Sequence, residues 1–200
     1  FQETFQSIDL LAGMESAIRA ERNMINHWFA SVAQGGAQTQ GLVGESNSSL
    51  GFFPTFFFYG NQYQINRILT EKILSGIDVS NHRLNVHQFK KMEEEILDLK
   101  RSFLPSRYAI ALMFLPALDK VALKVSQTQV ALDQAAIVAA LERYRLVNGG
   151  YPENLAALKP EFIAKVPGDL FHDHGLVYRL DEDDSFTLYS AGYNGTDDDG

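Results

Sequence analysis

Residues 141–200 contain a helix stop, a turn and two strand patterns in a fixed order. This order limits the possible folds of the chain more than any other feature of its sequence. A helical pattern ends at an Asn-Gly-Gly sequence at 148–150, where glycine supplies the left-handed backbone that stops a helix. Pro152 then suits the first turn of a short helix, and residues 176–180 and 186–190 alternate as two short strands. Because two strands alone are marginally stable in water, the sequence predicts that this hairpin packs against the preceding helix.

That preceding helix is predicted over residues 117–147 by an apolar stripe with a seven-residue repeat. The stripe contains Leu123, Val130, Ile137 and Tyr144, with Leu141 added. The same helix carries polar and charged residues in its interior: Lys120, Lys124, Gln127, Gln129 and Asp133. A helix with these residues cannot be an apolar membrane stalk.

The first part of the chain has the apolar periodicity of helices over residues 4–34, 62–74 and 86–103, with a short buried helix expected between Pro105 and Pro116. In the third of these segments the residues expected to face inward are Phe89, Met92, Ile96, Leu97 and Leu99. The sequence therefore predicts an α+β chain. A mostly helical region at 1–116 would be followed by a long helix and a small antiparallel hairpin module at 117–200.

Composition excludes several classes of function. The chain has 200 residues, 46% of them hydrophobic, no cysteine and a formal net charge of −8. The acidic balance argues against nucleic acid, which needs clustered Lys and Arg, and disfavours docking onto anionic lipid. The absence of cysteine excludes disulfides and thiolate metal sites.

No stretch reaches the roughly 18 consecutive apolar residues that a spanning helix needs. Because the chain begins at Phe1 and not at Met, we expect that a preceding segment has been removed, and an export signal or membrane anchor is one such segment. Contact with a membrane is expected only through that N-terminal anchor.

The C-terminal segments together resemble the globular end of type II secretion pseudopilins. They resemble even more closely a pseudopilin-like module at the C-terminal end of envelope proteins in some bacterial lineages. The resemblance rests on YRLVNGGYP at the helix exit, LAALKPEFIAKVP, GDLF, and the two strands GLVYRL and FTLYSAGYNG. Asp169 and Phe171 match the family's Asp-Pro-aromatic turn, with Leu170 in place of proline. Ser190, Gly192 and Gly195 match its closing corner, whereas Asn194 stands where the family usually has Asp.

This resemblance implies a non-enzymatic structural or interaction protein of the cell envelope, periplasmic or otherwise extracytoplasmic and membrane-anchored in its full-length form. Protein partners from secretion or envelope assembly are expected. The family's terminal loop binds Ca²⁺, which implies a calcium site with the oxygen ligands Asn194, Asp197, Asp198 and Asp199. The alternative for these acidic residues is a solvated terminus that only aids solubility.

An aromatic cluster at residues 52–59 has two interpretations. It is either part of the helical core or an apolar surface for a partner, and as a pocket it would make the chain a ligand-binding protein.

No hydrolase elbow or phosphate loop is present. His82 and His87 are predicted at the surface, and His172-Asp173-His174 is predicted as an exposed turn that lacks a third metal ligand. The chain is therefore not expected to be an enzyme.

Overall fold

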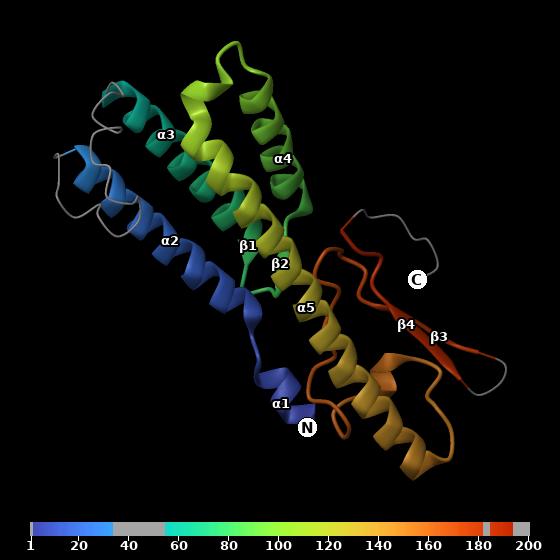
Figure 1. Ribbon diagram of the computed structural model, residues 1–200. Coiled ribbons are helices and arrows are strands. Elements are labelled where there is room, and N and C mark those ends of the chain that lie inside the picture. The colour runs from blue at the N-terminus through green and yellow to red at the C-terminus, as the bar shows by residue number, and fades with distance from the viewer. Residues whose placement is uncertain (1, 34–54, 182–184, 194–200) are drawn as a thin grey trace. The chain divides into compact units, whose positions relative to one another are not determined.

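The computed structural model describes residues 2–33, 55–181 and 185–193, and the structural statements below concern these residues. The fold is mainly helical with two small antiparallel two-stranded sheets, which confirms the α+β prediction (Figure 1). The elements in chain order are α1 (Gln2–Ser7), α2 (Leu10–Ala33), α3 (Thr55–Ile68), the π-helical turn η3 (Leu69–Leu74), β1 (Ile77–Asp78), β2 (Arg83–Leu84), α4 (Val86–Arg101), the 3-10 turn η4 (Pro105–Tyr108), α5 (Ala109–Asn148), the 3-10 turn η5 (Leu155–Leu158), β3 (Val177–Leu180) and β4 (Phe186–Tyr189).

The chain divides into two compact units that are built from interleaved segments. The hairpin unit comprises Phe1–Gly13, Asp78–Val86 and Leu123–Gly200, and the helical unit comprises Met14–Ile77 and His87–Ala122. Helices α2 and α5 therefore contribute residues to both units.

The helical unit is held together by one apolar stripe from each of its helices. In α4 the predicted inward residues Phe89, Met92 and Ile96 are buried at the expected three- and four-residue steps. The prediction for Leu97 is wrong, because its side chain is 44% exposed. The other fully buried apolar side chains of this unit include Phe29, Ile65, Ile68, Leu69, Ile73, Ala111 and Leu115.

Three predicted helix boundaries are wrong. α5 begins at Ala109, so Pro116 lies inside one continuous helix and not at its start. Proline removes the hydrogen bond to the residue four before it and crowds that residue's carbonyl, but the helix continues past this position. The helix predicted over 4–34 is two helices: α1 ends at Ser7, and Asp9 caps α2 by accepting a hydrogen bond from the Ala12 amide at 3.0 Å. α3 begins at Thr55, earlier than predicted.

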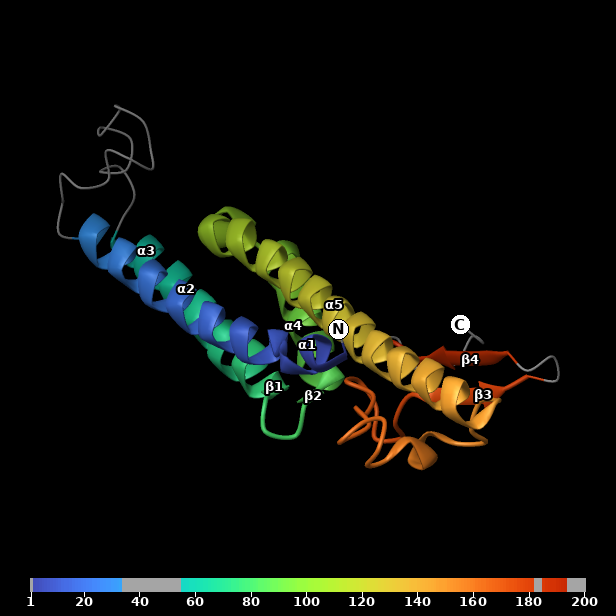
Figure 2. The same ribbon diagram turned by 90° about the horizontal axis from the view of Figure 1, so that it is seen from below.

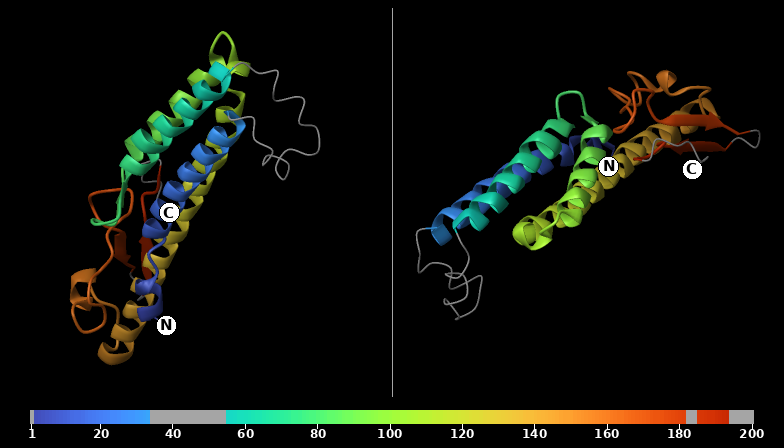
Figure 3. Two further views of the ribbon diagram at one scale, coloured as in Figure 1. Left: turned by 90° about the vertical axis from the view of Figure 1, so that its left-hand side faces the viewer. Right: turned by 90° about the horizontal axis from the view of Figure 1, so that it is seen from above.

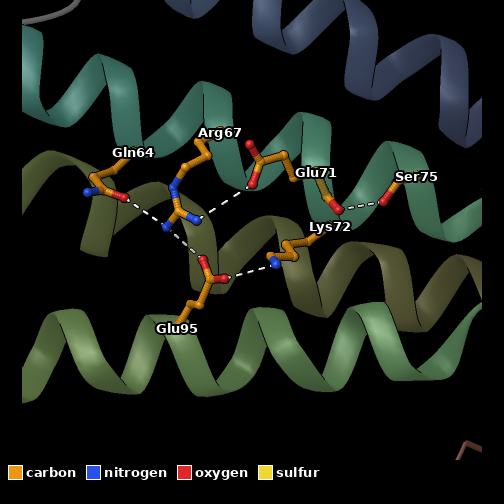
Figure 4. Close-up of polar contacts among 6 residues, drawn as sticks. All are labelled: Gln64, Arg67, Glu71, Lys72, Ser75 and Glu95. Carbon is orange, nitrogen blue, oxygen red and sulfur yellow. Dashed lines mark hydrogen bonds and ion pairs between the residues drawn. The ribbon is translucent and has the colours of Figure 1, made fainter.

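An ion-pair cluster joins α3 and η3 to α4 (Figure 4). The Arg67 guanidinium lies 2.7 Å from one Glu95 oxygen, and the Lys72 ammonium lies 3.0 Å from the other. Partial burial tends to raise the pKa of Glu95, but the hydrogen bonds from Lys72 and Arg67 outweigh it and hold that pKa below its usual range. The Glu95 carboxylate therefore stays ionised between two cations.

In the hairpin unit the C-terminal half of α5 packs against the β3–β4 hairpin (Figure 2). Ile137, Ala140 and Leu141 form the buried core with Leu158, Phe162 and Ile163 from the η5 region. The hairpin contributes partly buried apolar side chains to this core: Leu176, Tyr178, Phe186 and Leu188. The strands pair antiparallel, with Tyr178 opposite Leu188. The predicted packing of the hairpin on the long helix is confirmed.

The predicted end of the long helix is also confirmed. α5 ends at Asn148, and Gly149 follows in the left-handed conformation with φ 86°. Its amide donates to the Arg145 carbonyl at 2.8 Å, which satisfies one of the last carbonyls of the helix. None of the helices that the structure describes is both long enough and apolar enough for a membrane crossing.

Candidate functional site

A polar cleft of about 700 Å³ opens in the hairpin unit. Its lining comes from segments that are far apart in the sequence: Ile8 and Asp9 before α2, the turn at 79–83, and the loop at 164–175. α5 contributes two polar side chains, Gln129 and Asp133. Both are almost completely buried, although they lie on a helix whose other buried positions are mostly small or apolar.

A chain of hydrogen bonds runs through these polar residues. His82 Nε2 donates to Asp133 Oδ2 at 2.8 Å, and Gln129 Nε2 donates to Asp133 Oδ1 at 3.0 Å. Gln129 Oε1 in turn accepts from the Leu10 amide, at 2.8 Å. The Leu10 amide is one of the unpaired donors at the start of α2, so the Gln129 side chain caps that helix. The network therefore joins all the sequence segments that build the hairpin unit.

The β1–β2 turn presents His82 to this network. Asp78 accepts hydrogen bonds from the Asn81 side chain, the Ser80 hydroxyl and the Asn81 amide, and these bonds lower its pKa to about 2. His82 itself has a left-handed backbone with φ 55°, which is uncommon for a residue other than glycine. The Ser80 hydroxyl donates to Asp78 and not to His82, so the turn does not form a serine–histidine relay.

His82 lies partly at the surface, with 27% of its side chain exposed, but its ring also contacts Asp133, a partner that the sequence did not predict. The hydrogen bond to Asp133 raises the pKa of His82; partial burial opposes this effect, and the charges of Asp133 and Asp9 add to it. Lys165 is the cation that opposes it. The arrangement favours a protonated imidazole that clamps the turn to α5.

We expect this clamp to weaken as the pH rises. Because the pKa of His82 is higher in the folded chain than the ordinary value of 6.5, the stabilisation is complete below pH 6.5 and is lost as the pH rises through the folded pKa. The free energy of unfolding, measured in urea between pH 5.5 and 9, should therefore fall more steeply for the wild-type chain than for His82→Gln. Parallel pH profiles for the two chains would contradict the assignment.

The opposite wall of the cleft is fixed by Asp169 in the sequence GDLF. This buried carboxylate accepts from the Phe171 amide at 2.8 Å and from the Ser190 hydroxyl at 2.7 Å. The His172 Nε2 donates to the Gly192 carbonyl at 2.7 Å, and Arg83 pairs with Asp173. His172 thus contacts the chain after β4, and Asp173 contacts Arg83 at the start of β2.

Two segments of the sequence were considered as metal sites, and only the terminal one was predicted to bind a metal ion. Asn194, Asp197, Asp198 and Asp199 lie outside the described residues, so the calcium site stays a prediction. His172, Asp173 and His174 acquire no further ligand, because the described part of the chain contains no group of three His, Asp or Glu residues placed to hold a metal ion.

The aromatic cluster divides between core and surface. Phe58 is buried, whereas Phe56, Tyr59 and the following Tyr63 are 64%, 59% and 63% exposed. The three exposed residues follow each other at three- and four-residue steps and so share one face of α3, here called the aromatic face. Phe52 and Phe53 lie outside the described residues.

Sequence reasoning missed the His82–Asp133 pair, which joins residues 51 positions apart. The available signal was the presence of Gln129 and Asp133 four residues apart beside the apolar stripe of a helix, where a buried polar residue needs a partner. This cleft can hold a proton at His82, and its hydrogen bonds join three segments of the chain.

Comparisons with protein-family models, with curated proteins and with solved structures find no significant match to this chain.

Proposed function

We propose that this chain is a non-enzymatic structural or interaction protein of the cell envelope, outside the cytoplasm, with a pseudopilin-like module in its hairpin unit. Its helical unit binds a protein partner through the aromatic face of α3. The partner belongs to secretion or envelope assembly, as the resemblance of the hairpin unit implies.

The contacts among the pseudopilin-like segments support the first part of the proposal. GDLF and the corner after β4 are joined by the Asp169–Ser190 hydrogen bond. The Tyr-Pro at the helix exit meets the hairpin, since the Tyr178 hydroxyl donates to the Pro152 carbonyl at 2.7 Å and the Tyr151 and Phe186 rings lie 4.8 Å apart. Segments that resemble the family in sequence thus stabilise one another in one small module.

The aromatic face is the observation that carries the second part. Three large aromatic side chains on one side of a single helix expose apolar surface that water solvates poorly. Tyr and Phe are enriched at protein interfaces because they bury a large area with few rotatable bonds. Their exposure favours a surface contact over the alternative function, an enclosed apolar ligand pocket near residues 52–59.

The proposal is tested by site-specific photo-crosslinking in cells that express the full-length protein. With p-benzoylphenylalanine at position 63, we expect an envelope protein to be crosslinked, and the Tyr59→Ser change should weaken its co-purification about tenfold or more. The matched control carries the photo-crosslinker at the exposed Glu94 of α4 and should give no such adduct. Equal adducts at both positions, or a full-length protein confined to the cytoplasm, would contradict the proposal.

A further inference from the structure

The connection between α4 and α5 forms a second unusual surface on the helical unit. This surface, here called the basic-apolar tip, comprises Lys100, Arg101, Phe103, Leu104 and Arg107. The tip lies at the same end of the helical unit as the start of α3 (Figures 1 and 3). The side chain of Asn61 on α3 holds it there by donating to the Arg107 carbonyl at 2.9 Å.

The apolar side chains of the tip project into solvent. Phe103 is 97% exposed and Leu104 is 58% exposed. Exposed apolar side chains continue onto the first turns of α5, at Met113 and Phe114. A phenylalanine that is almost fully exposed among the described residues contributes little packing, which favours an external contact.

The charge of the tip is opposite to that of the whole chain. Between Asp98 and Asp119 there is no acidic residue, whereas Lys100, Arg101 and Arg107 are basic. All three are exposed, and within the described ranges none of them takes part in an ion pair. The Arg107 guanidinium lies 5.6 Å from the centre of the Tyr108 ring. Three cations therefore flank two exposed apolar side chains in the sequence.

We propose that the basic-apolar tip docks onto the surface of an anionic phospholipid bilayer. Phe103 and Leu104 would enter the boundary between headgroups and acyl chains, while the basic side chains meet lipid phosphates. Each Lys or Arg near such a surface adds to the attraction. This contact is separate from any N-terminal anchor and goes beyond the proposed protein partner.

The net charge of −8 does not oppose this contact. Charges are screened beyond a Debye length, which is about 8 Å at physiological ionic strength, so the local balance decides the interaction with a surface. Seven of the 25 acidic residues lie in the blocks at 181–184 and 197–199, far along the chain from the tip. A protein partner or a second copy of this chain would also cover Phe103. The three cations, which form no ion pair with any residue that the structure describes, favour the lipid phosphates.

Vesicle binding tests the proposal with the 200-residue chain. Flotation with phosphatidylcholine vesicles that contain 30% phosphatidylglycerol should give partitioning at least tenfold stronger than with pure phosphatidylcholine, and this partitioning should fall in 0.5 M salt. The double variant Phe103→Ser and Leu104→Ser should lose at least tenfold in partitioning. So should Lys100→Gln with Arg101→Gln, a pair that leaves the Arg107–Tyr108 contact in place.

A matched control replaces two exposed apolar residues of the hairpin unit, Leu146→Ser and Val147→Ser, and should partition like the wild-type chain. The absence of cysteine allows a single NBD label at Phe103→Cys, whose emission should shift to the blue on anionic vesicles, unlike a label at Glu94→Cys. Equal partitioning to both vesicle types, or equal partitioning of all variants, would overturn the proposal. The proposal would also be overturned if the chain did not bind vesicles and instead formed a dimer that the Phe103→Ser substitution dissociates.

Discussion

Replacing Leu141 by alanine should lower the free energy of unfolding by about 2–5 kcal/mol. Leu141 is fully buried where α5 packs against Leu158, Phe162 and Ile163, and the β3–β4 hairpin covers the same cluster. The truncation removes apolar contacts and leaves a cavity that the surrounding helix and hairpin can only partly fill. Urea denaturation followed by circular dichroism measures the loss, and hydrogen exchange of residues 177–189 should rise with it.

The control for this prediction is Leu146→Ala on the same helix. Leu146 is 80% exposed, so its truncation should change the free energy of unfolding by less than about 0.5 kcal/mol. If both variants had the same small effect, Leu141 would not be a core residue. The hairpin would then not depend on α5 for its stability.

Replacing Asn61 by alanine should lower the free energy of unfolding of the helical unit by about 1–3 kcal/mol. The Asn61 side chain is completely buried and donates to the carbonyls of Phe57 and Arg107, at 2.8 and 2.9 Å. The Asn61 side chain also accepts a hydrogen bond from the Ala111 amide at 3.0 Å. This amide lies in the first turn of α5, where backbone amides have no acceptor within the helix. Alanine would remove these three hydrogen bonds and leave the buried Ala111 amide without this acceptor.

An aspartate at this position separates the roles of the side chain. Asn61→Asp can still accept from the Ala111 amide but cannot donate to two carbonyls, so it should also be less stable than the wild-type chain. The side chain of the exposed Asn148 donates to the carbonyl of Tyr144 in its own helix, and Asn148→Ala should change the stability by less than about 0.5 kcal/mol. A fully stable Asn61→Asp variant would mean that only the helix cap matters.

Local periodicity predicted the elements that depend on neighbours in the sequence. The three- and four-residue steps of Phe89, Met92 and Ile96 identified the buried side of α4, and Gly149 marked the end of α5. Pro116 was misleading, because a proline inside a long helix costs a hydrogen bond that packing on either side can offset. The start of this helix could therefore not be predicted from the position of a proline alone.

The candidate sites were harder to predict than the elements. His82 had no neighbouring pattern that pointed to Asp133, because the pair exists only after the β1–β2 turn has docked on α5. Asn61 was also not marked, although it caps a helix that begins 48 residues later. For the tip, composition was misleading, since the charge summed over the whole chain conceals a short basic segment beside Phe103.

By itself, the sequence determined that the chain is mainly helical and that a hairpin follows its longest helix, because helix stops and strand alternation depend on residues within a few positions of one another. Only the tertiary structure decided which polar side chains are buried together and which aromatic residues remain in solvent. Gln129 and Asp133 are satisfied by partners from distant segments, and Phe103 is left uncovered by every described element. Long-range packing sets burial, and burial decides whether a polar group needs a partner within the chain or an apolar one needs a partner outside it.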